Sequence, residues 1–269
     1  MTRSRCIGLL VVLALLAYPF LEPYWVQVYD EQWASPDVPA AWDGKTIVFL
    51  SDIHHGAYFS RWRLRRLVEQ VNALHPDLIL LGGDYVYAHR DYIAPCFAEL
   101  GRLQAPLGKF GVMGNHDHYM SATATYHNML LAGIRPVDNL GFWVEAGGER
   151  IRIGGVGHLR EDSQDVGPTL EGTSEGDLVI LLSHNPDFAE SVSDGRVDLM
   201  LSGHTHGGQV ALFGWAPWVP SRYGLKYRTG RVDTGITTVI ISNGIGTVFP
   251  PLRLGARPQI VRLRLRRTG

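Results

Sequence analysis

Blocks of apolar and polar positions alternate along the chain and predict buried strands separated by amphipathic helices. Residues 46–51 (TIVFLS) form a continuous apolar run, typical of a strand that is covered on both faces. Ser60 can cap a helix, and the apolar residues of 61–74 then keep a helical spacing. The alternation continues with a strand at 77–81, a helix near 92–100, a strand at 110–113 and a helix at about 122–132. This succession predicts parallel strands joined by helices.

The second half of the chain is richer in strands than the first. Short apolar runs predict strands at 142–145, 150–154, 178–182, 199–202, 238–242 and 260–265. No linker divides the two halves, so we expect a single α/β domain over residues 45–269, with two packed sheets flanked by helices. Residues 30–44 are rich in Pro, Ala and Trp, and we interpret them as a linker.

The N-terminus combines positive charge with a long apolar run. Arg3 and Arg5 precede an apolar stretch over residues 6–21, which as a helix spans roughly 24 Å against about 30 Å for a bilayer core. We interpret residues 1–29 as an uncleaved anchor in the inner membrane, with a cleaved signal peptide and a buried helix as alternatives. A spanning helix with this charge bias places the domain outside, whereas a helix lying in one leaflet leaves it cytoplasmic. The sequence does not decide between these two locations of the domain.

Composition and charge narrow the class of protein. With 45% hydrophobic and 19% charged residues, the chain is not intrinsically disordered. The net charge of −1 hides an asymmetry: residues 221–269 hold ten Lys or Arg and one acid (+9), and the rest hold 15 basic and 25 acidic groups (−10). The basic segment suits phosphates or an anionic membrane surface, and the alternative is a strand edge protected by charge.

Polar residues that suit metal binding or proton transfer follow the predicted strands directly. They are Asp52, His54, Asp84, Asn115, His116, Asp117, His184, His204 and His206. In an open α/β fold the strand ends converge on one crevice, so these side chains are expected to meet. A single Asp-x-His is usually a surface turn, but five such motifs in succession are a specific signal. The two cysteines, Cys6 and Cys96, lie outside this set, which argues against a structural zinc site.

The motifs Asp-x-His, Gly-Asp, Gly-Asn-His-Asp, His and Gly-His-x-His resemble, in the same order, those of the calcineurin-like metallophosphoesterases. The resemblance covers about residues 45–258 and implies a four-layer αββα sandwich with two divalent metal ions. It implies Asp52, His54, Asp84 and His206 at one metal, and Asp84, Asn115, His184 and His204 at the other, with Asp84 as the bridge. Imidazole, carboxylate and amide ligands suit Mn, Fe, Zn or Co, and we favour Mn.

The same resemblance implies a metal-dependent hydrolase of phosphoric esters or pyrophosphates, in which a metal-bridging hydroxide attacks the phosphorus. It implies that His116 is an unligated general acid or transition-state stabiliser. We expect Asp117 to shape the turn. His55 and His118 are interpreted as solvated loop residues, with a role beside the ligands as the alternative. Structural or surface roles are expected for His75, His89, His127 and His158.

The segments 242–247 (SNGIGT) and 250–258 (PPLRLGARP) make the chain similar to membrane-anchored bacterial members. Those include envelope phosphodiesterases and UDP-2,3-diacylglucosamine pyrophosphatases of lipid A biosynthesis, so the resemblance implies a lipid- or envelope-linked substrate. We expect Trp215 and Trp218 to cover acyl chains or rest at the membrane interface, with a packing loop as the alternative. Arg222 and Lys226 suit a diphosphate.

Two other classes of function compete with this one. The first is a nuclease or cyclic-nucleotide phosphodiesterase of the same fold. A pI of about 6.8 argues against nucleic acid, because a nuclease needs a long basic groove. The second is a non-catalytic metal-binding membrane scaffold, against which the complete ligand set and His116 argue. No protein partner is implied.

Overall fold

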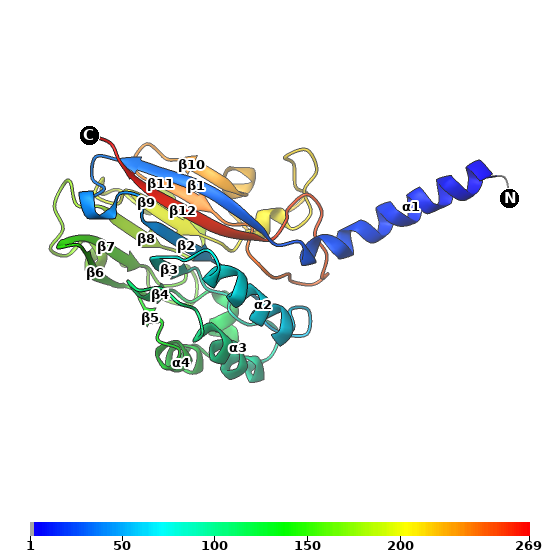
Figure 1. The fold of residues 1–269 in the computed structure, drawn as a ribbon, viewed down its shortest axis with the longest axis horizontal. Helices are drawn as coiled ribbons and strands as arrows, with labels where there is room; N and C mark the ends of the chain where they lie inside the picture. The colour runs from blue at the N-terminus through cyan, green and yellow to red at the C-terminus, as the bar shows by residue number, and fades with distance from the viewer. Residues whose placement is uncertain (1–2) are drawn as a thin grey trace.

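The computed structural model describes the backbone of residues 3–269 and the side chains of residues 7, 8, 10 and 12–269. Two six-stranded mixed sheets pack face to face (Figure 1). In the order of pairing, the first sheet contains β1 (Gln27–Ser35), β12 (Gln259–Arg267), β2 (Thr46–Leu50), β3 (Leu78–Leu81), β4 (Lys109–Gly111) and β5 (Arg135–Pro136). The second contains β10 (Gly230–Asp233), β11 (Thr238–Ile241), β9 (Leu199–Ser202), β8 (Val179–Leu182), β7 (Glu149–Gly155) and β6 (Leu140–Ala146).

Helices complete the two outer layers, which confirms the predicted sandwich. The first sheet is covered by α2 (Arg61–Asn72), α3 (Ile93–Leu100) and α4 (Asn115–Leu131) (Figure 1). Only short elements cover the second sheet: α5 (Gly167–Leu170), η4 (Pro186–Ser191) and η6 (Gly224–Tyr227). The remaining helical elements are α1 (Arg3–Leu21), η1 (Glu22–Tyr24), η2 (Ala40–Trp42), η3 (Arg90–Tyr92) and η5 (His206–Gly208).

Local sequence explains the central elements. In β2, Ile47 and Phe49 face the core between the sheets, while Val48 and Leu50 face the helices, so both faces are apolar. Helix α2 begins after Ser60, whose hydroxyl accepts a hydrogen bond from the backbone N–H three residues on. Parallel pairing of β2, β3 and β4, and of β7, β8 and β9, brings their carboxyl ends to one edge of each sheet.

The structure differs from the expected linker over residues 30–44. β1 pairs in parallel with β12 from Gln27↔Gln259 to Ser35↔Arg267, and Trp42 in η2 is completely buried. Residues 30–35 therefore belong to the first sheet, and Trp42 belongs to the core between the sheets. The sequence of β1 (QVYDEQWAS) does not predict this strand. β1 is outermost in its sheet and buries few of its side chains, so its sequence lacks an apolar run.

The basic C-terminal segment fits the alternative interpretation as a charged strand edge only in part: β10, which carries Arg231, is outermost in the second sheet. β12 is an inner strand, paired with β1 on one side and β2 on the other. Two of its arginines form ion pairs with acids: Arg262 with Asp30 at 2.5 Å and Arg266 with Asp43 at 3.8 Å.

Helix α1 projects from the rest of the molecule (Figure 1). Its described apolar side chains are exposed, for example Leu10 (65%) and Leu15 (68%). Among the described residues, no helix has the length and hydropathy needed to cross a membrane. The end of α1 is fixed to the domain, because the carbonyl oxygen of Pro19 accepts a hydrogen bond from the backbone N–H of Arg253. The buried Glu22 carboxylate accepts two more, from Gly255 and Ala256.

Glu99, on α3, is a buried carboxylate held by three arginines. Its oxygens lie 2.7 Å from Arg61 Nε, 3.2 Å from Arg65 Nη2 and 2.9 Å from Arg102 Nη1. Burial disfavours the charge, but the hydrogen bonds from the arginines outweigh it and lower the pKa of Glu99 from 4.5 to about 2. The ionised form therefore stabilises the packing of α3 against α2.

We expect Glu99→Gln to lower the free energy of unfolding by about 1–3 kcal/mol at pH 7, discounted for the exposed arginines. The folded-state pKa is depressed, so this contribution is complete above pH 4.5 and is lost as the pH falls towards 2. Urea unfolding at pH 7 and pH 3 measures the difference, with the exposed Glu69→Gln as control. An equal loss at both pH values contradicts the assignment.

Candidate metal centre

The candidate ligand residues lie where strands of both sheets end. Asp52 and His54 follow β2, Asp84 follows β3, and Asn115 begins α4 after β4. From the second sheet, His184 follows β8, and His204 and His206 follow β9. The predicted convergence of strand ends is therefore present, and the site lies at the junction of the two sheets.

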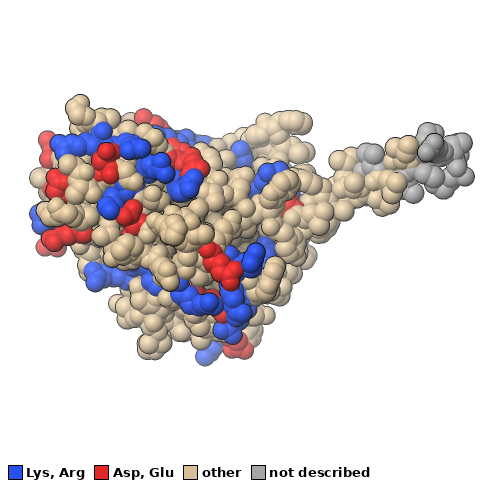
Figure 2. Space-filling model, in the orientation of Figure 1, with Lys and Arg blue, Asp and Glu red and all other residues tan. Residues whose placement is uncertain are grey.

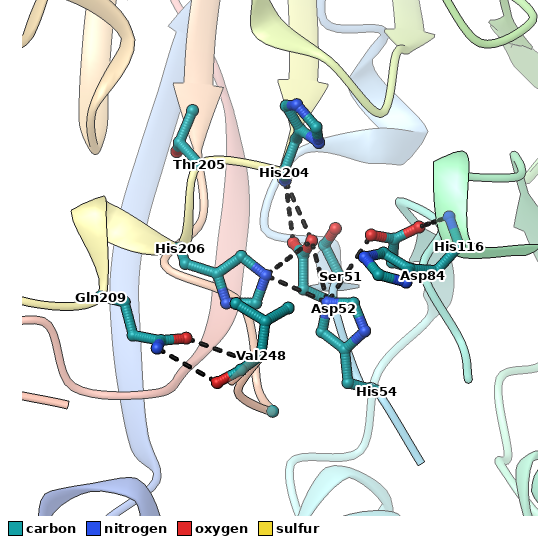
Figure 3. Close-up of polar contacts among 12 residues, drawn as sticks. Ser51, Asp52, His54, Asp84, His116, His204, Thr205, His206, Gln209 and Val248 are labelled. Atoms are coloured by element: carbon teal, nitrogen blue, oxygen red, sulfur yellow. Dashed lines mark hydrogen bonds and ion pairs between the residues drawn. The ribbon is translucent and has the colours of Figure 1, made fainter. Parts of the chain in front are cut away.

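The first group consists of Asp52, His54 and His206, all buried (Figure 3). His206 Nε2 lies 3.5 Å from Asp52 Oδ1. The Nε2 atoms of His54 and His206 are 3.0 Å apart, and their rings are stacked. Two imidazole nitrogens and one carboxylate oxygen thus face a common point.

The second group consists of Asp84, His184 and His204. His184 Nε2 lies 3.3 Å from Asp84 Oδ2 and 3.1 Å from His204 Nδ1. His54 Nε2 is 3.6 Å from the same Asp84 oxygen, so this carboxylate lies between the two groups.

The donor atoms fit a pair of divalent cations. In each group the ligand atoms lie within 4.8 Å of one another. The buried Asn115 Oδ1 has no hydrogen-bond partner among the described residues, and a cation supplies one. His184 Nδ1 lies 2.7 Å from the Gly82 carbonyl oxygen, which only accepts, so Nδ1 carries a proton and Nε2 is the nitrogen that can bind a cation once its own proton is released. These features are consistent with a dinuclear metal site.

Burial sets the charge of most of these groups. It lowers the pKa of His54 and of His204 to about 3, and that of His206 well below the ordinary value. Those rings are therefore neutral, the form that binds metals. Burial raises the pKa of Asp52 to about 6. At His184 burial opposes the charge, but Asp84 and Asp52 raise the pKa to about 10.

The backbone at the candidate ligands is strained. Five non-glycine residues there have left-handed φ values: Asp52 (53°), His54 (49°), Asp84 (55°), His204 (69°) and His206 (53°). Such conformations are costly and concentrate at functional sites. Hydrogen bonds hold them, among them two from the His204 N–H to the Asp52 carboxylate, at 3.1 and 3.0 Å. A side chain at Gly203 would place Cβ 2.3 Å from Asp52 Oδ2, so this approach requires glycine.

The structure brings His116 to the same centre. Its backbone N–H donates to Asp84 Oδ1 at 2.8 Å, and its half-buried ring lies edge-on to that of His54 with centroids 4.8 Å apart (Figure 3). The Asp117 carboxylate accepts hydrogen bonds from the backbone N–H groups of Asp84, Tyr85 and Gly114. Asp117 therefore shapes the turn, as expected.

A family model described as calcineurin-like phosphoesterase matches residues 45–208, more than half of the chain. The chain belongs to the calcineurin-like phosphoesterase family. It is a metal-dependent phosphoesterase, with buried His/Asp groups that suit metal binding.

Relatives of this phosphoesterase occur in several bacteria. The chain is 35% identical to YkuE of Bacillus subtilis, an uncharacterized metallophosphoesterase, over 93% of this chain and 89% of YkuE. It is 32% identical to phosphodiesterase YaeI of Escherichia coli, over 81% of each chain. A solved dimetal phosphatase from Danio rerio shares the fold, with a TM-score of 0.50 at 12% identity over 76% of this chain and 88% of that one.

The predicted substrate-binding residues of the phosphoesterase do not all lie together. Trp218 and Arg222 line a pocket of about 430 Å³ whose wall includes Asn115 and His204. Trp215 is exposed, and Lys226 forms an ion pair with Glu190; neither lines this pocket.

The sequence analysis did not single out Arg253, and it expected only a structural or surface role for His158; both residues lie near the centre. Arg253 is completely buried, and its guanidinium donates to the carbonyl oxygens of Gly246 and Ala256 and contacts His206 Nδ1 at 3.3 Å. His158 is 4% exposed, with its ring 5.9 Å from that of His184. It follows β7 as the ligands follow their strands, and this signal was available in the sequence.

Proposed function

We propose that this phosphoesterase hydrolyses a phosphodiester or pyrophosphate bond with two bound divalent cations, Mn²⁺ being favoured over Fe, Zn or Co. The observation that carries the proposal is the pair of buried His/Asp groups on either side of Asp84. Asp52, His54, Asp84 and His206 are assigned to one cation, and Asp84, Asn115, His184 and His204 to the other. When bound, such cations neutralise phosphate oxygens and acidify a bridging water.

His116 is assigned the proton transfer to the leaving group. Its position supports this role: the backbone N–H is fixed on Asp84, while the ring stands beside His54 and is half-buried. Asp117 holds the turn that carries it, through three backbone hydrogen bonds. The chain thus supplies a donor next to the reacting phosphate.

We further propose a lipid- or envelope-linked substrate, UDP-2,3-diacylglucosamine being one example, and a position at the inner membrane. Exposed apolar side chains on α1, together with Phe213, Trp215 and Trp218, support this location, because they favour an apolar surface over water. Figure 2 shows Lys and Arg interspersed with Asp and Glu on the visible face, which gives little support to a nuclease.

We expect the purified chain to hydrolyse bis(p-nitrophenyl) phosphate, to lose this activity in EDTA and to regain it with Mn²⁺. The physical reason is that the phosphodiester anion repels hydroxide unless cations neutralise it. Release of p-nitrophenol, followed spectrophotometrically, measures each step. An absence of hydrolysis in protein shown by metal analysis to be loaded favours the scaffold alternative instead.

A further inference from the structure

A pocket of about 430 Å³ adjoins the metal centre and contains Trp218 and Arg222, two of the predicted substrate-binding residues. Asn115 and His204 form its inner wall, so it opens directly beside the second group of candidate ligands. Its other walls come from Tyr119, His158–Arg160 and residues 218–222. A group attached to a phosphate at the centre would have room in this space.

His158 is the buried hydrogen-bond donor of the pocket. Its side chain is 4% exposed, and its Nδ1 accepts a hydrogen bond from the backbone N–H of Arg160 at 3.4 Å. The proton of the neutral ring is then on Nε2, which is buried and has no partner among the described residues. An unpaired buried donor is unfavourable, so this N–H is suited to an acceptor supplied by a ligand.

Two exposed arginines add positive charge at the mouth of the pocket. Among the described residues, neither Arg160 nor Arg222 has an ion-pair partner. The pocket also contains Asp187, but its carboxylate already accepts hydrogen bonds from Ser221 Oγ at 2.5 Å and from the Arg222 N–H at 2.9 Å. Trp218, 66% exposed, offers an apolar face next to these donors.

We propose that this pocket binds a second anionic group of the substrate, a phosphate joined to the one that is hydrolysed, and that His158 is a specificity-determining residue. The inference rests on the proposed function, because it places the first phosphate at the metal centre. His158 Nε2–H and the guanidinium groups of Arg160 and Arg222 face the second phosphate, and Trp218 packs against the organic group that follows it.

The test compares ligands that differ by one phosphate. Calorimetry on Mn²⁺-loaded protein gives Kd for α,β-methylene-ADP against AMP, and for the methylenediphosphonate analogue of farnesyl diphosphate against farnesyl monophosphate; neither diphosphate analogue has a P–O–P bond to hydrolyse. We expect the wild-type chain to prefer the diphosphate by at least about tenfold in one pair, which also identifies a nucleotide or a lipid source. Arg160→Ala and Arg222→Ala should each reduce that preference about 5–10-fold.

His158→Leu should reduce the preference similarly, whereas His158→Gln, which keeps an N–H donor, should restore most of it. Arg66→Ala, an exposed arginine on α2 that lies outside the pocket, should leave the ratio unchanged. Equal ratios in wild-type protein and the arginine variants overturn the pocket assignment. Hydrolysis of bis(p-nitrophenyl) phosphate by the same wild-type sample tests the proposed function separately, so the two failures are distinguishable.

Discussion

Asp84→Ala is expected to remove both metal ions and to reduce phosphodiester hydrolysis by more than about 10³-fold. Substitution of a residue that only hydrogen-bonds to a metal ligand already lowers metal affinity or activity by about 10–100-fold, and loss of a ligand shared by two metals should cost more. The carboxylate lies between the two groups, with Oδ2 3.3 Å from His184 Nε2 and 3.6 Å from His54 Nε2. Its other oxygen accepts the His116 N–H. One substitution therefore disrupts both groups and the position of the proposed acid.

Elemental analysis of the purified variant, together with its rate on bis(p-nitrophenyl) phosphate, measures the effect. Asp91→Ala, which removes a carboxylate that is 80% exposed, is the matched control and should retain both metals. A variant at Asp84 that keeps two metals per chain would show that the two groups do not share this ligand. Circular dichroism separates loss of metal from loss of fold.

His116→Asn is expected to keep both metals and to lower kcat by about 10²–10⁴-fold, the usual contribution of proton transfer. The ring stands beside His54, and the residue's backbone rather than its side chain contacts Asp84. Removing the imidazole therefore removes a proton donor and leaves the proposed ligands in place.

The leaving group sharpens this test. An alkoxide needs a proton more than p-nitrophenolate does, so the loss should be larger for a dialkyl phosphate, which can release only an alkoxide, than for bis(p-nitrophenyl) phosphate. His127→Asn, at an exposed position on the same helix, is the control. Loss of metal in the His116 variant would instead identify this residue as a ligand, which its place beside Asp84 and His54 also permits geometrically.

The sequence predicted those strands and site residues whose positions depend on neighbouring residues in the chain. The apolar runs of β2, β3, β8 and β9 are buried on both faces, and the polar residues after them reach the same site because parallel strands end together. β1 was missed because its stability comes from pairing with β12, which is more than 220 residues away in sequence.

The same reason explains the missed side chains. Whether Lys226 is available to a substrate depends on Glu190, 36 residues earlier, which holds its ammonium group. The environment of Arg253 depends on carbonyl groups of Gly246, Ala256 and His206, which only the folded loop brings together. Neither arrangement can be predicted from the order of residues along the chain.

The attachment of α1 has a practical consequence for anyone who shortens the chain. Glu22 caps the N–H groups of Gly255 and Ala256, and the loop they belong to carries Arg253, whose guanidinium abuts the ring of His206. Removal of the first 26 residues deletes Glu22 and leaves these two N–H groups without their acceptor, in the loop whose Arg253 contacts His206. The end of the projecting helix is thus connected to the metal centre through the loop that carries Arg253, and a cut that keeps this connection lies before Pro19.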